Sequence, residues 1–155
     1  MQSLLQLRSI AADYDALLLD LWGVVHDGTH LYPGAREAMT QLKAAGKHII
    51  LVSNAPRRAH KAVAVLRQLG VADALYDHVI TSGELGYQWL AQGGCRWGKK
   101  YFYIGPDKDA DVLDGLDFVR VPDVQQCDFL LNVGFGSEGE QPADFAPLLS
   151  AACAL

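Results

Sequence analysis

A short apolar run that ends in an acidic residue most constrains how this chain folds. Residues 16–19 are continuously apolar, and Asp20 follows them directly. A run of this length and character is typical of a parallel strand buried on both faces. A charged residue at the end of such a strand must be exposed or paired in the cleft at the carboxyl edge of the sheet. Asp20 is therefore a candidate site residue, although an aspartate that only caps the turn before Gly23 explains this position equally well.

Further apolar runs alternate with amphipathic stretches along the chain. Pro33 and Gly34 introduce a helical pattern that Gly46 ends, and Gly70 ends a second one. The alternation of strand and helix predicts an α/β fold with a right-handed parallel layer. The predicted strands are residues 16–19, 48–52, 78–81, 101–104, 118–121 (an edge strand) and 129–133, and the predicted helices are residues 35–45, 56–69 and 82–91.

The second predicted strand also ends in polar residues, Ser53 and Asn54. Ligands of open α/β sheets bind outside the carboxyl ends of the strands, so Asp20 and Ser53 on neighbouring strands can face one substrate. Ser53 or Asn54 could instead only cap the helix that follows. The two roles are compatible, because a helix N-terminus also attracts phosphate.

Composition narrows the class of partner. A net charge of -5 and a pI near 5.4 argue against a nucleic-acid binder, and no apolar run is long enough to span a bilayer. The cysteines are odd in number and far apart, which indicates neither a disulfide framework nor a zinc site and favours the reducing cytoplasm. One basic cluster could meet a single phosphate; it comprises Arg57, Arg58, His60 and Lys61.

Two segments together resemble a known family. Residues 17–25, LLLDLWGVV, and residues 49–54, IILVSN, are similar to the first two motifs of the haloacid dehalogenase (HAD) superfamily. The resemblance is closest to the class with a large inserted cap, the NagD-like or p-nitrophenylphosphatase-like group, in a branch that reads D-x-W-G. It extends through residues 81–84 and 128–134. It implies a Rossmann-like parallel sheet flanked by helices.

The resemblance also implies a reaction and a set of site residues. Asp20 would attack phosphorus to form an aspartyl phosphate, and Ser53 would hold the phosphoryl oxygens. Asp20 and the main-chain carbonyl of Trp22 would bind Mg²⁺, while Trp22, Gly23 and Asn54 would contact the substrate. The implied function is a Mg²⁺-dependent phosphatase of a small phosphorylated metabolite. Oligomeric state stays open, with a homo-oligomer allowed.

The chain departs from the family pattern at residue 22. The family places its general acid/base, an aspartate, two residues after the nucleophile, and this chain has Trp22 there. General acid/base assistance contributes roughly 10²- to 10⁴-fold, so its loss leaves a slow enzyme, another acid, or a non-catalytic binding or regulatory protein as the alternative. His26 and Asp27 are near enough to be considered as replacements, but we expect them to belong to the hairpin flap after the first motif.

The family's later lysine and acidic motifs should follow the cap, and the sequence stops before them. We therefore expect residues 1–84 to be the N-terminal part of the core, and residues 85–155 to be the start of a truncated cap. On this reading the chain by itself has little activity and binds Mg²⁺ weakly. A capless alternative uses Lys99 or Lys100 as the lysine, with Asp107 and Asp111 as metal ligands.

Three other patterns have ordinary explanations. Residues 134–139 form a G-x-G-x-x-G, but the acidic residues nearby and Pro142 favour a loop over a dinucleotide site. His26 and His30 are four apart, but Gly28 between them argues against a helical metal pair. The aromatic residues after position 85 are expected to pack in the core rather than touch substrate; they are Trp89, Trp97, Tyr101, Phe102 and Tyr103.

Overall fold

The structure, a computed structural model, describes residues 7–153. The chain divides into two compact units, Met1–Ser82 and Gly83–Leu155. The division falls two residues before the predicted boundary at residues 84 and 85. The assignment of the second unit to a cap stays a prediction.

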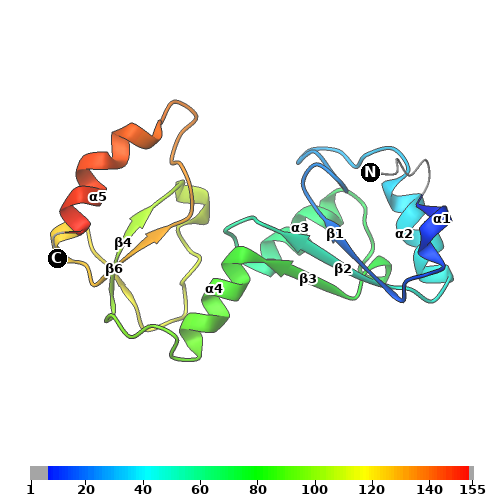
Figure 1. Ribbon diagram of the computed structural model, residues 1–155, viewed down its shortest axis with the longest axis horizontal. Coiled ribbons are helices and arrows are strands. Elements are labelled where there is room, and N and C mark those ends of the chain that lie inside the picture. The colour runs from blue at the N-terminus through cyan, green and yellow to red at the C-terminus, as the bar shows by residue number, and fades with distance from the viewer. Residues whose placement is uncertain (1–6, 154–155) are drawn as a thin grey trace. The chain divides into compact units, whose positions relative to one another are not determined.

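The first unit is built on a parallel sheet. Its strands are β1 (Ala16–Asp20), β2 (His48–Ser53) and β3 (His78–Thr81), in the order β1-β2-β3 (Figure 1). Asp20 lies opposite Val52, and Ser53 lies opposite Thr81. The predicted strands and their parallel pairing are confirmed, and the three strands end at one edge of the sheet.

Amphipathic helices supply the other half of this unit's core. They are α2 (Ala35–Ala44) and α3 (Ala59–Gln68), with the short α1 (Arg8–Ala11) and a 3₁₀ turn, η1 (Asp73–Leu75). Met39 and Leu42 of α2, and Leu66 of α3, are buried against Ile49 and Leu51 of β2 in one apolar cluster. After α2 the chain turns at Gly46, where φ is 74° and the N–H of Lys47 donates to the carbonyl of Leu42.

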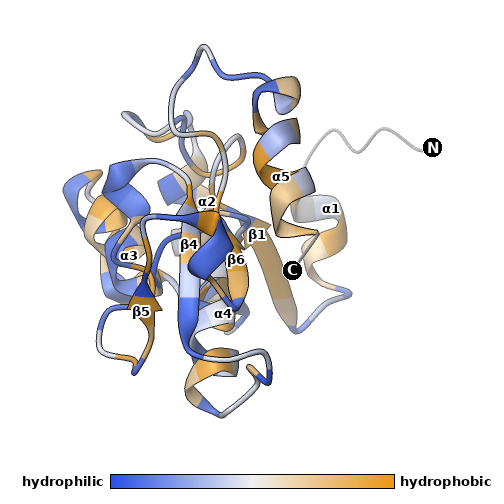
Figure 2. Ribbon diagram, turned by 90° about the vertical axis from the view of Figure 1, so that its left-hand side faces the viewer, coloured by the Kyte–Doolittle hydropathy of each residue, from blue (hydrophilic) through white to orange (hydrophobic). Residues whose placement is uncertain are grey.

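The prediction that residues 16–19 are buried on both faces is wrong. Leu17 and Leu19 pack against the core, but Leu18, on the other face, is 70% exposed. Figure 2 shows β1 as hydrophobic along most of its length, so composition alone does not separate the two faces. Among the described residues, nothing covers Leu18, because β1 pairs only with β2 and the core lies on the opposite face.

The helix predicted from residue 56 begins at Ala59 instead. The preceding backbone is committed to other hydrogen bonds, since Ser82 Oγ donates to the carbonyls of Asn54 and Ala55. The residue before the helix, Arg58, is extended, with φ -63° and ψ 146°. Residues 54–58 therefore form a loop at the carboxyl end of β2 rather than the first turn of α3.

The second unit has its own small parallel sheet. Its strands are β4 (Lys100–Ile104), β5 (Val119–Arg120) and β6 (Phe129–Asn132), in the order β5-β4-β6, so β5 is the edge strand that the sequence predicts. The helices are α4 (Ser82–Ala91), which crosses the division, and α5 (Ala146–Ala152). The 3₁₀ turns are η2 (Asp107–Asp109), η3 (Val124–Gln126) and η4 (Pro142–Phe145).

Aromatic side chains pack in this second unit, partly as predicted. Tyr101 and Tyr103 are buried at 7% and 6% exposure and contact Val112 and Leu113 in one cluster. Trp89 and Trp97 contact each other, with ring centroids 6.0 Å apart, yet they remain 49% and 59% exposed. Packing therefore explains the tyrosines fully and the tryptophans only in part.

Asp77 ties the turn before β3 to its neighbours. Its carboxylate accepts from Lys43 Nζ at 2.8 and 2.9 Å and from the main-chain N–H of Ile49 at 2.7 Å. The Lys43 hydrogen bond, and next that of Ile49, lower the pKa of Asp77 to about 2. One carboxylate thus joins the end of α2, the start of β2 and the start of β3.

We expect Asp77→Asn to lower the melting temperature of the first unit at pH 7. Because the folded-state pKa lies below the ordinary value of 3.8, the ionised Asp77 stabilises the fold above about pH 4, and this contribution disappears as the pH falls toward 2. Thermal melts followed by circular dichroism should therefore show a difference between wild type and variant that narrows over this range. Asp73→Asn, which breaks an exposed pair with Arg67, should have a smaller effect at pH 7. A difference independent of pH would contradict this account.

Candidate active site

Ser53 ends β2 inside the fold. It is 7% exposed, and its Oγ accepts a hydrogen bond from the N–H of Ala55 at 3.2 Å. It therefore shapes the loop that follows, while its hydroxyl proton stays available for an acceptor. The interpretation that Ser53 or Asn54 caps the next helix is wrong, because α3 begins only at Ala59 and its N-cap is Arg58, with no side-chain hydrogen bond. The bond to Ala55 thus holds the loop and does not prevent Ser53 from binding a ligand.

The end of β3 holds the loop after β2. Thr81, with no exposed surface, donates from Oγ1 to the carbonyl of Arg57 at 2.6 Å. Ser82 Oγ lies 2.9 Å from the carbonyl of Asn54 and 2.8 Å from that of Ala55. These hydroxyls fix the path of residues 54–57. Sequence reasoning matched residues 81–84 to a family segment but gave Thr81 and Ser82 no part in the site.

The segment after β1 is the flap that the sequence predicts. Leu21 and Val25 are buried at 3% and 2% exposure, and the N–H of Val25 donates to the carbonyl of Leu21 at 2.9 Å. The N–H of Tyr32 returns to the carbonyl of Val25 at 3.0 Å. Isolated bridges join His26 to Trp22 and to Leu31. The flap is thus anchored by two apolar side chains, and it holds His26 and Gly28 over the end of the sheet.

A cavity of about 440 Å³ lies between the flap and the loop after β2. Its lining includes the predicted site residues Trp22, Ser53 and Asn54, together with His26 and Arg57. Ala62 and Val65 of α3 supply apolar wall. The cavity therefore combines a hydroxyl, an amide, an imidazole and a guanidinium, which suits an anionic ligand with some apolar contact.

Two predicted site residues, Asp20 and Gly23, are not part of this cavity's lining as the described residues form it. Asp20 is exposed at the same edge as Ser53, opposite Val52 in the register. Successive side chains alternate across a strand, so Asp20 projects on the face of Val52 and Ser53 on the opposite face. Gly23 forms the turn after β1 with φ 86°, and its N–H donates to the carbonyl of His26. The structure thus brings Asp20 and Ser53 to one edge but not into one wall.

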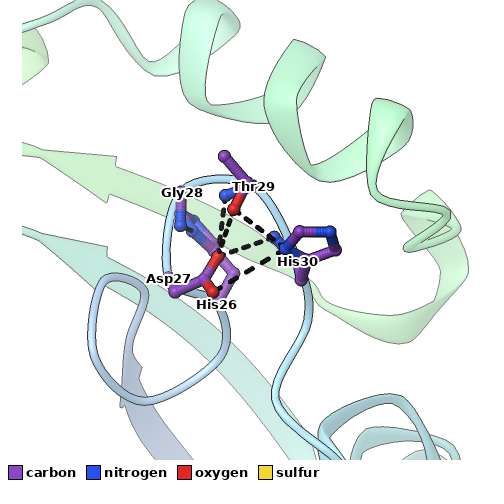
Figure 3. A network of polar contacts seen from close by, with 5 residues as sticks. All are labelled: His26, Asp27, Gly28, Thr29 and His30. Carbon is purple, nitrogen blue, oxygen red and sulfur yellow. Dashed lines mark hydrogen bonds and ion pairs between the residues drawn. The ribbon is translucent and has the colours of Figure 1, made fainter.

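His26 and Asp27 have different surroundings (Figure 3). His26 is 7% exposed, and burial lowers the pKa of its imidazole against the opposing charges of Asp27 and Asp20. Asp27 Oδ1 accepts from the N–H of Thr29 at 2.8 Å, the N–H of His30 at 2.6 Å and the Thr29 hydroxyl at 2.9 Å. These bonds lower the pKa of Asp27 to about 2. Asp27 thus stabilises the flap, and His26 alone of the two faces the cavity.

The other motifs of the sequence also lie within the described residues. Within residues 7–153, no three His, Cys, Asp or Glu side chains gather as a metal site, around Asp107 and Asp111 or around His26 and His30. In the glycine loop, the N–H of Gly136 donates to Glu140 Oε2 at 2.6 Å. A carboxylate therefore takes the place that a pyrophosphate would need.

Arg57 is the cavity residue that sequence reasoning identified least clearly. The basic cluster suggested a contact with one phosphate, but the pattern does not separate Arg57 from Arg58, His60 and Lys61. Only Arg57 of these lines the cavity. Arg57 differs from the other three in its place four residues after Ser53. It lies in the loop whose carbonyls accept hydrogen bonds from Thr81 and Ser82.

Comparison with known proteins identifies relatives over the same region. The family model for haloacid dehalogenase-like hydrolases matches residues 17–119. A glycerol-3-phosphate phosphatase of Gallus gallus is 33% identical over 106 residues, which are 68% of this chain and 34% of that protein. A D-glycerol 3-phosphate phosphatase of Mycobacterium tuberculosis is 31% identical over 107 residues, or 69% of this chain and 29% of that protein. The chain thus spans about a third of these curated relatives.

Solved structures of haloacid dehalogenase-like proteins are similar to this chain. A haloacid dehalogenase-like hydrolase from Brucella suis superposes with a TM-score of 0.84 at 33% identity, covering 96% of this chain and 56% of that one. The glycerol phosphate phosphatase of M. tuberculosis in complex with magnesium gives a TM-score of 0.64 at 26% identity, covering 94% of this chain and 43% of that one.

No helix within residues 7–153 is long and apolar enough to cross a membrane.

The match of the family model over residues 17–119 includes both predicted motifs, the flap and the loop after β2. This chain belongs to the haloacid dehalogenase-like hydrolase family.

Proposed function

We propose that this chain carries the phosphoryl-binding part of a Mg²⁺-dependent phosphatase that acts on a small phosphorylated metabolite. The main support is the common edge at which β1 and β2 end: Asp20 is exposed at that edge, and Ser53 and Arg57 line the cavity there. A hydroxyl and a guanidinium in one cavity are suitable donors for phosphoryl oxygens. The phosphatase names of the curated relatives agree with this chemistry.

We infer a two-step reaction at these groups. A carboxylate oxygen of Asp20 would attack phosphorus, and the bond to the ester oxygen would break as that oxygen takes the bonding electrons and then a proton from water. Water next attacks the aspartyl phosphate, releasing inorganic phosphate and restoring the carboxylate. Ser53 and Arg57 would hold the phosphoryl oxygens while negative charge shifts among them. Trp22, Gly23 and Asn54 are proposed as the residues around the bound substrate.

Mg²⁺ fits the oxygen donors at this edge. The exposed Asp20 carboxylate and the main-chain carbonyl of Trp22 are the ligands that this chain would provide. Mg²⁺ commonly takes one or two protein oxygens and completes its coordination with water and substrate phosphate. Bound there, it would offset the repulsion between the carboxylate and the phosphoryl group.

Substrate, location and assembly belong to the same proposal. Glycerol phosphate is the first substrate to test, because both curated phosphatases compared above are named for it.

The cysteines, which are free in the structure, support a reducing compartment such as the cytoplasm. Net charge disfavours nucleic acid as a partner. A homo-oligomer is compatible with this proposal. We also propose that the second unit is the first part of a cap.

We expect Asp20→Asn in the complete gene product to abolish the release of phosphate from p-nitrophenyl phosphate or glycerol phosphate. Loss of the nucleophile should lower kcat/KM at least about a thousandfold, because an amide cannot form the aspartyl phosphate. Asp13→Asn, at another exposed aspartate of the first unit, is the matched control and should retain wild-type activity. Equal background rates in wild type and Asp20→Asn would favour the alternative of a non-catalytic binding or regulatory protein, which Trp22 at the acid position motivates.

We further expect residues 1–155 alone to bind Mg²⁺ weakly and to turn over an aryl phosphate slowly. The physical reason is that a carboxylate must approach an anion with too few positive groups nearby to offset the charge. Calorimetric titration with Mg²⁺ and an aryl phosphate assay on this chain measure both. Efficient turnover that disappears in Asp107→Asn or Asp111→Asn would instead support the capless arrangement.

A further inference from the structure

The backbone of His26 is fixed relative to the turn that follows Asp20. Its N–H donates to the carbonyl of Leu21 at 3.1 Å, and its carbonyl accepts from the N–H of Gly23 at 2.9 Å. The side chain lines the same cavity as Ser53 and is 7% exposed. The main chain that carries the imidazole is therefore held in place in the wall of the proposed phosphate site.

The ring's orientation is also determined. The main-chain N–H of Gly28 donates to His26 Nδ1 at 2.9 Å (Figure 3). A main-chain nitrogen can only donate, so Nδ1 is the acceptor, and the neutral ring carries its proton on Nε2. Burial lowers the pKa of His26 and so favours this neutral form. Within residues 7–153, Nε2 makes no hydrogen bond, which leaves it for a ligand in the cavity.

Gly28 permits this arrangement because it has no side chain. Its φ is 100°, which residues with a Cβ rarely adopt, and a Cβ built there would lie 3.2 Å from Trp22 Nε1. The indole of Trp22 thus rests near the same glycine whose N–H orients His26. Asp27, the other candidate for the missing acid, is engaged by Thr29 and His30 and accepts rather than donates.

We propose that His26 Nε2–H donates a hydrogen bond to a phosphoryl oxygen of the monoester bound against Ser53. His26 would then contact the substrate from the flap, opposite the loop after β2 that carries Ser53 and Arg57. The ring keeps its proton in this role, so no change in its charge is required. This assignment rests on the proposed function, because it needs a phosphoryl group in the cavity.

Binding of inorganic phosphate to the complete gene product, measured by calorimetry, tests the assignment. His26→Ala should raise the dissociation constant about tenfold, the usual worth of one hydrogen bond to an anion, and His26→Gln, which keeps an N–H donor, should recover much of the loss. His30→Ala is the matched control, since His30 is on the same flap with a side chain that is 83% exposed. Ser53→Ala should weaken binding independently of His26.

A second readout uses the wild-type protein and does not depend on how the variants fold. Nitrogen-15 spectra of the imidazole should show the Nε2–H tautomer, and added phosphate should shift the Nε2 resonance more than that of Nδ1. An Nδ1–H tautomer, or unchanged affinity in His26→Ala while Ser53→Ala loses it, would overturn the role of His26 and leave the phosphatase proposal standing. Failure of the wild-type protein to bind phosphate would overturn both.

Discussion

The hydrogen bond from the buried Thr81 hydroxyl to the carbonyl of Arg57 determines the form of the site. At 2.6 Å it joins the last residue of β3 to the loop after β2, and the next hydroxyl, of Ser82, holds the carbonyls of Asn54 and Ala55. Main-chain carbonyls need hydrogen-bond partners, and these side chains provide them where no strand continues. The loop therefore leaves the sheet along a fixed path, and α3 begins only at Ala59.

The main-chain N–H groups of the flap also need hydrogen-bond partners, and here a carboxylate provides them. Residues 27–30 make a turn whose main-chain N–H groups have no strand partner, and the Asp27 carboxylate accepts from two of them. A carboxylate used in this way cannot also supply a proton near neutral pH, because its pKa is about 2. Asp27 therefore stabilises the flap and does not serve as an acid. The remaining polar side chain that faces the cavity from this segment is His26.

Much of this organisation follows from sequence pattern, and some of it does not. The apolar runs at 16–19 and 48–52 predict two parallel strands, and the polar residues after them predict the edge where a site forms. The same run at 16–19 does not reveal that Leu18 is exposed, because burial depends on what packs on each face rather than on the strand's own residues. Likewise, four basic residues follow Ser53, and only the held loop selects Arg57 for the cavity.

The orientation of His26 could not be predicted for a related reason. It depends on an N–H of Gly28 two residues away, in a conformation with φ 100° that the sequence allows but does not require. Trp22 limits that choice, since its indole lies where a Cβ on residue 28 would be crowded. Gly28 therefore meets both side chains: its Cα lies beside the indole of Trp22, and its N–H orients the imidazole of His26. On the role proposed for His26, its N–H donor would face the cavity that Trp22 also lines.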